Sequence, residues 1–261
     1  MESTESDFVR EQVRSRYAEI AKNEDSCCAS SCCAPTSLAN NSLSTRLGYS
    51  EDELATVPDG SNMGLGCGNP QVIAALQPGE VVLDLGSGGG FDCFLAARQV
   101  GEDGRVIGVD MTPEMIAKAR ANARQAGFEN VEFRLGEIEH LPVADSSVDI
   151  IISNCVINLS PGKQQVFREA YRVLRPHGRL AVSDVVAISP LPENVKRNMD
   201  AYCGCVAGAA TVEELTKILS QAGFAKISVD VQQSSDQFIR DWFPGSGVEN
   251  HVRSAAITAY K

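Results

Sequence analysis

From about residue 80 onward, the chain of 261 residues alternates between short apolar runs and longer amphipathic segments. Short apolar runs bounded by turn residues predict buried strands, and apolar positions at helical spacing predict the helices that cover them. This alternation predicts an α/β fold with a doubly wound, mostly parallel sheet. The strands are expected at 80–87, 105–111, 131–137, 148–155, 178–187, 226–233 and 251–261, and the helices at 91–100, 113–127, 163–174 and 213–224.

The first 79 residues follow a different pattern. Residues 8–22 carry apolar side chains at helical spacing and predict an amphipathic helix. The Ser-, Ala-, Asn- and Cys-containing stretch 25–42 predicts a loop or linker. Ser50, with Glu53 at the capping-box position, predicts the start of a short helix, and the glycine-rich stretch 60–68 predicts irregular backbone.

The composition excludes several classes of function. The formal charge of -11 argues against partners with a phosphate backbone and against anionic membranes, because binding to either requires clustered Lys and Arg. The N-terminal sequence has no apolar core typical of a secretory signal, so we expect a cytoplasmic protein. In that compartment the nine cysteines are mostly reduced, which favours soft-metal or redox chemistry over structural disulfides.

A glycine-rich turn, VVLDLGSGGGF, joins the first predicted strand to its helix. Gly86, Ser87 and Gly88 allow a tight turn and a close approach of a ligand. Asp84 precedes this turn, where a carboxylate repels a pyrophosphate but attracts an ammonium group such as that of a methionine-derived ligand. Asp110, at the end of the next strand, is suitably placed for ribose hydroxyls. The alternative for both acids is a strand-end cap satisfied by backbone amides.

Ligands of doubly wound sheets bind at the carboxyl ends of the strands. We therefore expect further contacts to the same ligand from residues that follow the strands and from the glycine-rich segment. These are Met111, which is placed to lie against an adenine, together with Glu137, Ile138, Asn154, Met63 and Gly64.

Three cysteines lie at a strand end or in irregular segments rather than on apolar faces. Cys155 follows the fourth strand, and the segments that contain Cys67 and Cys205 can bring these two thiols over it. Three thiolates suit a soft, trigonal centre. Zinc prefers four tetrahedral ligands, often closely paired, and the spacing of Cys203 and Cys205 fits this poorly. The alternative for each is a buried small hydrophobe, which we favour for Cys93 within its helix.

Four stretches, LDLGSGGG, GVDMT, LPVADSSVDIIIS and VLRPHGRL, together resemble the class I S-adenosylmethionine-dependent methyltransferases over roughly residues 70–260. The resemblance implies a seven-stranded, Rossmann-like sheet with an antiparallel last strand, and S-adenosyl-L-methionine as the cofactor. It also implies Asp84 near the methionine amine, Asp110 on the ribose, and Glu137 and Ile138 at the adenine.

The sequences PDGSNMGLGCGNP, SNCVINLSP and CVAGA are similar to those of the arsenite methyltransferases. This resemblance implies that Cys67, Cys155 and Cys205 bind arsenic(III), as arsenite or a thiol conjugate, through three thiolates. It also implies an upstream redox cysteine, for which we choose Cys32 or Cys33, and reduction of the resulting disulfide by thioredoxin or glutathione. The expected division is a segment completing the active site (1–69), a cofactor-binding core (70–187), an arsenic-binding insertion (188–212) and the remainder of the sheet (213–261).

Arsenic held by three thiolates keeps a lone pair that attacks a methyl group without losing a proton, so no general base is required. This suits a chain with three histidines, none of them in a catalytic setting.

Longer family members carry a further C-terminal region, so we expect its contribution to be absent or replaced here.

Two other functions are compatible with the fold: a methyltransferase for an organic acceptor, and a non-catalytic metalloid sensor. The cysteine placement argues against the first, and the intact Asp84, Asp110 and glycines argue against the second. The pairs Cys27–Cys28 and Cys32–Cys33 are either redox partners, metalloid-capturing thiols or a leader without a role, and Cys203 is an extra thiol. We expect a monomer.

Overall fold

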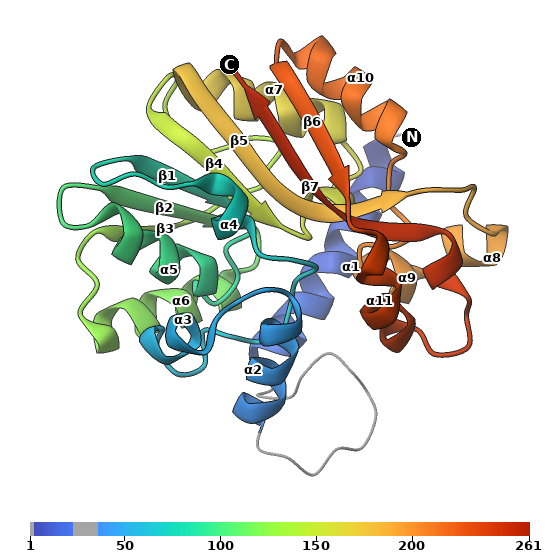
Figure 1. The fold of residues 1–261 in the computed structure, drawn as a ribbon, viewed down its shortest axis with the longest axis horizontal. Helices are drawn as coiled ribbons and strands as arrows, with labels where there is room; N and C mark the ends of the chain where they lie inside the picture. Colours follow the sequence, from blue (N-terminus) through green and yellow to red (C-terminus); the bar gives the residue numbers. More distant parts are fainter. Residues whose placement is uncertain (1–2, 23–35) are drawn as a thin grey trace.

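The fold is built on a seven-stranded sheet with the strand order β3-β2-β1-β4-β5-β7-β6, seen in a computed structural model that describes residues 3–22 and 36–261 (Figure 1). Strand β7 runs antiparallel to both of its neighbours, and the pairs among the first five strands are parallel. The predicted fold class is therefore confirmed. The strands are β1 (Val81–Leu85), β2 (Arg105–Asp110), β3 (Val131–Leu135), β4 (Val148–Asn154), β5 (Leu174–Ala187), β6 (Ala225–Val231) and β7 (Val252–Tyr260).

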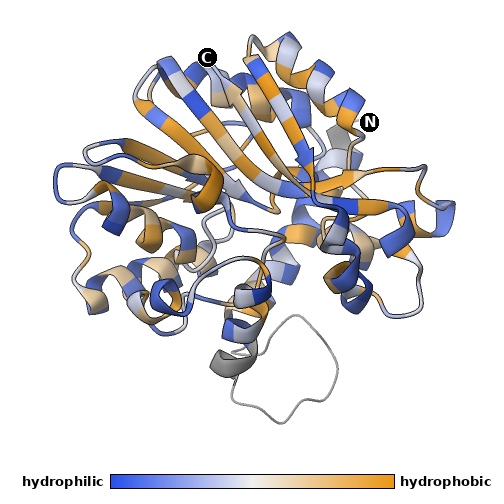
Figure 2. Cartoon of the chain, viewed as in Figure 1, coloured by the Kyte–Doolittle hydropathy of each residue, from blue (hydrophilic) through white to orange (hydrophobic). Residues whose placement is uncertain are grey.

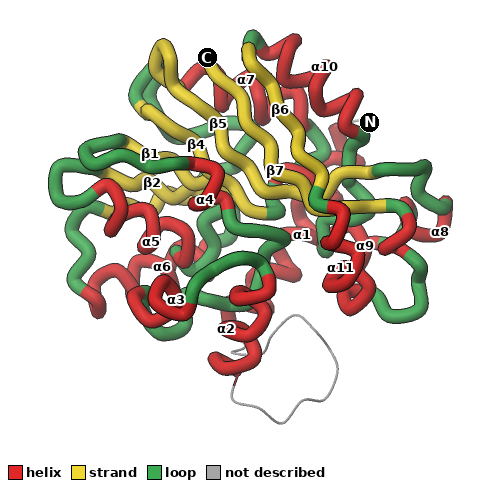
Figure 3. Tube along the Cα trace, in the orientation of Figure 1, coloured by secondary structure: helices red, strands yellow, loops and turns green. Residues whose placement is uncertain are grey.

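Helices cover both faces of the sheet, as Figure 3 shows by its secondary-structure colours. Successive side chains of a strand point to opposite faces, so the apolar run of β4 supplies both sides of the core. Ile150 and Ile152 pack with α4, α5 and α6, whereas Ile151 packs with α7 and α10. The helices of the described ranges are α1 (Ser3–Lys22), α2 (Thr36–Arg46), α3 (Glu51–Thr56), α4 (Pro70–Ala74), α5 (Phe91–Val100), α6 (Pro113–Ala126), α7 (Lys163–Val173), α8 (Glu193–Lys196), α9 (Met199–Cys203), α10 (Val212–Ala222) and α11 (Asp236–Trp242).

A third apolar cluster lies beyond the carboxyl ends of the strands. Val13 from α1, Ile239 from α11 and Val206, which follows α9, pack around Cys155 in this cluster. The hydropathy colours of Figure 2 show the helices of this region with both polar and apolar positions. Within residues 3–22 and 36–261, no helix is long and apolar enough to cross a membrane.

The loop prediction for residues 25–42 is wrong in part, because α2 begins at Thr36. Side-chain amides stabilise this helix against the glycine-rich segment: Asn40 donates a hydrogen bond to the Asn62 carbonyl at 3.0 Å, and Ser44 donates to Asn62 Oδ1 at 3.1 Å. A helix that is held by polar contacts to a distant segment needs no periodic pattern of apolar residues. The sequence pattern therefore did not predict this helix. The paired cysteines of the same stretch lie outside the described residues.

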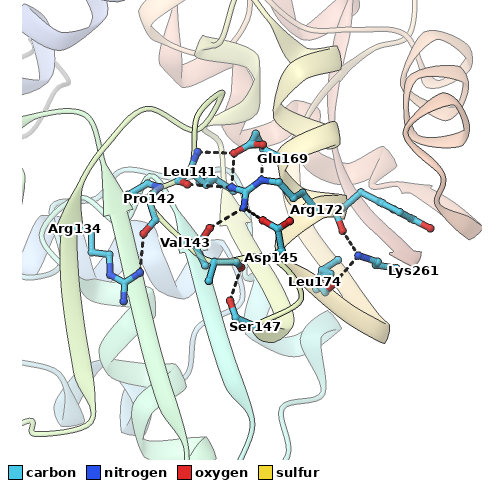
Figure 4. Close-up of polar contacts among 12 residues, drawn as sticks. Arg134, Leu141, Pro142, Val143, Asp145, Ser147, Glu169, Arg172, Leu174 and Lys261 are labelled. Carbon is cyan, nitrogen blue, oxygen red and sulfur yellow. Dashed lines mark hydrogen bonds and ion pairs between the residues drawn. The ribbon is translucent and has the colours of Figure 1, made fainter.

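A polar network fixes the connection between β3 and β4 (Figure 4). Arg172 of α7 donates hydrogen bonds to the carbonyls of Val143 (2.9 Å) and Leu141 (3.1 Å), and Glu169 accepts the Leu141 N–H at 2.9 Å. These contacts satisfy backbone groups of an irregular segment and therefore restrict its position. Ile138, at the start of this connection, is held in the core as a result.

We predict that Gly90→Ala lowers the free energy of unfolding by about 3 kcal/mol. Gly90 has a φ of 93°, and an added Cβ would lie 2.7–2.9 Å from ring atoms of Phe94 and Phe133. The matched control is Gly127→Ala, at a φ of 72° with no atom within 4 Å of the added Cβ, which should cost only about 1 kcal/mol. Urea unfolding of both variants tests this, and equal losses would refute the packing argument.

Candidate active site

A cavity of about 650 Å³ lies at the carboxyl ends of β1, β2 and β4. Asp84, Asp110 and Asn154 from these three strands line it, together with Met63 and Gly64 from the glycine-rich segment. The parallel strands bring these side chains to one edge of the sheet, as the sequence predicts. A cavity of this size suits a ligand as large as a nucleoside derivative.

The lining of this cavity is strongly acidic. Positive charges come from Arg10 and Arg16, both on α1. This excess of negative charge favours a ligand that carries positive charge. The lining carboxylates are Asp84, Asp92, Asp110, Glu139, Asp200 and Asp241.

Asp84 and Asp92 are two neighbouring buried acids of the lining, with exposed fractions of 2% and 8%. Burial, and then repulsion from Asp92, raises the pKa of Asp84 well above its usual value. The Cys93 thiol donates a hydrogen bond to Asp84 at 3.1 Å. A bound ammonium group would offset the repulsion between the two acids, so this pair fits a cationic ligand.

Asp110 accepts backbone hydrogen bonds from Gly88 (3.0 Å) and Thr112 (2.8 Å). The strand-end cap, one of the two alternatives for this acid, is therefore present, and Asp110 also lines the cavity. Ser87 lines the same wall, and its buried hydroxyl has no hydrogen-bond partner among the described residues. This oxygen is inaccessible and lies next to Gly108 of β2, so the hydroxyl faces the sheet rather than the cavity.

Glu137 does not line the cavity, in contrast to the prediction for this residue. Its carboxylate pairs with Arg14 at 3.0 Å and with Arg10 at 3.7 Å, which directs it toward α1. Its neighbours Ile138 and Glu139 line the cavity instead. The arginines on α1 that attract Glu137 lie 123 or more residues away in sequence, so local pattern could not reveal the pairing.

Cys67, Cys155 and Cys205 meet beside this cavity. All three are buried, with exposed fractions of 1%, 9% and 2%. The sulfurs of Cys67 and Cys155 lie within 4.8 Å of each other, and the Cys205 thiol donates a hydrogen bond to the Cys155 carbonyl oxygen. Cys155 and Cys205 line the cavity, whereas Cys67 does not. The structure therefore brings together the three predicted thiols.

The backbone around these thiols has an uncommon conformation. Cys155 and Cys205 have φ values of 59° and 64°, in the left-handed region that side chains rarely adopt. Cys67 is held by close backbone packing, because a Cβ at Gly68 would lie 2.1 Å from Ser183 Oγ. Such strain clusters at functional sites, where the surrounding structure must maintain it.

Asp184 is a neighbour of these thiols that the sequence did not single out. One of its carboxylate oxygens and the sulfurs of Cys67 and Cys155 all lie within 4.8 Å of one another. The register of β4 and β5 pairs Asn154 with Ser183, so the next residues along the two chains, Cys155 and Asp184, are neighbours. Burial raises the pKa of Asp184 to about 6, although the backbone amide of Val185 lowers it. Two polar residues, Ser183 and Asp184, interrupt the otherwise apolar fifth predicted strand, and this interruption could have indicated a site there.

Burial also raises the pKa values of the thiols. The pKa of Cys67 is raised to about 11 by burial, and that of Cys155 is raised well above its usual value for the same reason. The hydrogen bond with Cys155, and then burial, raises the pKa of Cys205. The three thiols therefore remain protonated near neutral pH.

The family comparison agrees with this site. A methyltransferase-domain model matches residues 76–223. The chain is 54% identical to an arsenite methyltransferase of Halobacterium salinarum over 97% of its own length and 66% of the relative's. It is 35% identical to the solved structure of CrArsM, an arsenic(III) S-adenosylmethionine methyltransferase from Chlamydomonas reinhardtii, covering 88% of this chain and 74% of that one with a TM-score of 0.61.

The chain belongs to the arsenite methyltransferase family. S-adenosylmethionine is the cofactor of this family, and the acidic lining of the cavity fits that cation. The chain spans about two thirds or less of the length of its curated relatives, for example 40% of the human arsenite methyltransferase, to which it is 43% identical over 152 residues.

We predict that iodoacetamide labels Cys203 at least about tenfold faster than Cys67, Cys155 or Cys205. Iodoacetamide reacts with the thiolate, and burial both disfavours this form and limits access of the reagent. Cys203 is half-buried, whereas the other three are buried. Below its raised pKa, the thiolate fraction of Cys67 increases with pH, so its labelling should accelerate as the pH rises. Peptide mass spectrometry of the folded protein measures each rate. Comparable rates for Cys67 and Cys203 at pH 7 would contradict the burial of the site.

Proposed function

We propose that the protein transfers a methyl group from S-adenosylmethionine to arsenic(III) held by Cys67, Cys155 and Cys205, and so detoxifies arsenite. The observation that carries this proposal is the grouping of three buried cysteines around Cys155, beside an acidic, nucleoside-sized cavity. A soft trigonal centre matches three sulfur ligands, and a cationic methyl donor matches the acidic cavity.

The residues of the cavity would bind the cofactor. When bound, the cofactor supplies a methyl group on a positively charged sulfur. We assign the ammonium to Asp84 and Asp92, and the ribose to the remaining lone pairs of Asp110. Met111 and Ile138, which both line the cavity, are assigned to the adenine in place of Glu137. The glycine turn with Ser87 forms the floor of the site.

The protonated thiols suit arsenite because of its proton balance. Neutral As(OH)₃ reacts with three thiols to give an arsenic tris-thiolate and three water molecules, with no net release of protons. A divalent cation would instead displace three thiol protons, which the raised pKa values of Cys67, Cys155 and Cys205 disfavour. The thiol set therefore discriminates in favour of arsenite near neutral pH.

The bound arsenic retains a lone pair opposite its three sulfurs, so the attack on the methyl group needs no general base. The chain contributes by holding the acceptor against the cofactor cavity in a buried setting. Methylation takes two electrons from arsenic. We propose that two cysteines return them by forming a disulfide, with Cys32 or Cys33 as one partner, and that thioredoxin or glutathione reduces it.

This chemistry requires reduced thiols, so we propose the cytoplasm as the compartment. We propose a monomer. The substrate is free arsenite or an arsenic(III) thiol conjugate.

We predict that Cys155→Ser abolishes methylation of arsenite, because a hydroxyl is a poor ligand for a soft centre. Binding of S-adenosylhomocysteine should change less than about threefold, because the variant keeps the cavity shape. The control is Cys93→Ser, which keeps a donor beside Asp84 and should still methylate arsenite. Mass-spectrometric detection of methylated arsenic measures the reaction. Wild-type turnover by Cys155→Ser would overturn the proposed function.

A further inference from the structure

A buried hydrogen-bond network surrounds Asn154, between the cofactor cavity and the cysteines. On one side, Asn154 Oδ1 accepts the N–H of Cys67 at 3.0 Å. On the other side, its amide nitrogen donates to the Gly68 carbonyl (2.8 Å), the Tyr49 hydroxyl oxygen (3.0 Å) and Asp92 Oδ2 (3.3 Å). One side chain thus holds the segment that carries Cys67 and also contacts an acid of the cavity wall.

Tyr49 and Asp92 also belong to this network, as does Gln71, whose amide donates to Asp92 Oδ1 at 3.3 Å. The Tyr49 hydroxyl donates to Asp92 Oδ1 at 2.8 Å, so its oxygen is free to accept from Asn154. Tyr49 is 3% exposed and does not line the cavity, whereas Asp92 does. The ring of Tyr49 packs edge-on against the ring of Phe91, with 4.9 Å between the ring centroids. Tyr49 therefore contacts neither expected ligand but joins the groups that do.

We infer that Tyr49 and Asp92 are positioning residues that act through Asn154 to couple the ammonium end of the cofactor site to Cys67, so that cofactor and arsenite bind cooperatively. This inference rests on the proposed function, because it requires a cationic ligand beside Asp84 and Asp92 and arsenic on Cys67.

The physical reason lies in the charge of Asp92. Burial raises the pKa of Asp92 and so opposes its ionised form. An ammonium group beside it favours the carboxylate, and a carboxylate accepts hydrogen bonds more strongly than a neutral acid does. Stronger bonds from Tyr49 and Asn154 then fix the amide of Asn154, whose oxygen orients the Cys67 backbone. Coupling of this kind is reciprocal, so arsenite must tighten cofactor binding by the same factor.

The test measures the dissociation constant of S-adenosylhomocysteine with and without arsenite, because this product carries the ammonium but allows no turnover. Calorimetry is done on the full chain with a phosphine as reductant. Replacing the N-terminal cysteines by Ser avoids arsenite binding to them; these are Cys27, Cys28, Cys32 and Cys33. We expect arsenite to tighten binding by about fivefold or more. In Tyr49→Phe, which keeps the ring contact but removes the hydroxyl, the factor should approach one while each ligand alone binds within about threefold of wild type.

Two controls make the result specific. Tyr171→Phe removes a hydroxyl outside the cavity lining, next to Phe224 and Lys261, and should leave the coupling unchanged. The ligand 5′-methylthioadenosine lacks the ammonium and should show no tightening by arsenite. A factor of one in the wild type, or an unchanged factor in Tyr49→Phe, would overturn the inference. Failure of arsenite to bind at all would instead overturn the proposed function.

Discussion

The site depends on how the chain leaves strand β4. Asn154, its last residue, holds the Cys67 segment through the hydrogen bond from the Cys67 N–H. Cys155 follows in a left-handed conformation, donates its N–H to the Ser183 carbonyl at 2.8 Å, and accepts the Cys205 thiol on its own carbonyl oxygen. Two consecutive residues therefore hold the segments of Cys67 and Cys205, which are 138 residues apart in sequence, against the edge of the sheet. Without these contacts, the three thiols would belong to independent loops.

The same strand end separates two different chemical environments. On the cavity side, buried carboxylates such as Asp84 repel one another and favour a cationic ligand. On the other side, protonated thiols such as Cys67 favour a neutral ligand that exchanges hydroxide for sulfur. Each environment carries a cost in free energy, since neighbouring buried carboxylates repel one another and the backbone of Cys155 and Cys205 is strained. The proposed function depends on this adjacency, which places the acidic cavity next to the thiols.

Much of this arrangement is predictable from the sequence, because parallel strands bring their carboxyl ends to one edge and the glycine turn marks the ligand side. The positions of Asp84 and Asp110 in the cavity wall follow from that rule. The rule fails for Glu137, since arginines distant in sequence compete for its charge. It is silent on Tyr49, Asp92 and Asp184, because register and burial, rather than local spacing, bring these groups to the site.

The central claim, that Cys67, Cys155 and Cys205 act as one trigonal ligand set, is tested most directly by arsenic X-ray absorption spectroscopy of the arsenite-loaded protein. The measurement uses the full chain with the four N-terminal cysteines at 27, 28, 32 and 33 replaced by Ser, so that arsenic reports on this site. Our account predicts three sulfur neighbours per arsenic, falling to two in Cys205→Ser. Oxygen neighbours in the first protein, or the same sulfur number in both, would contradict it.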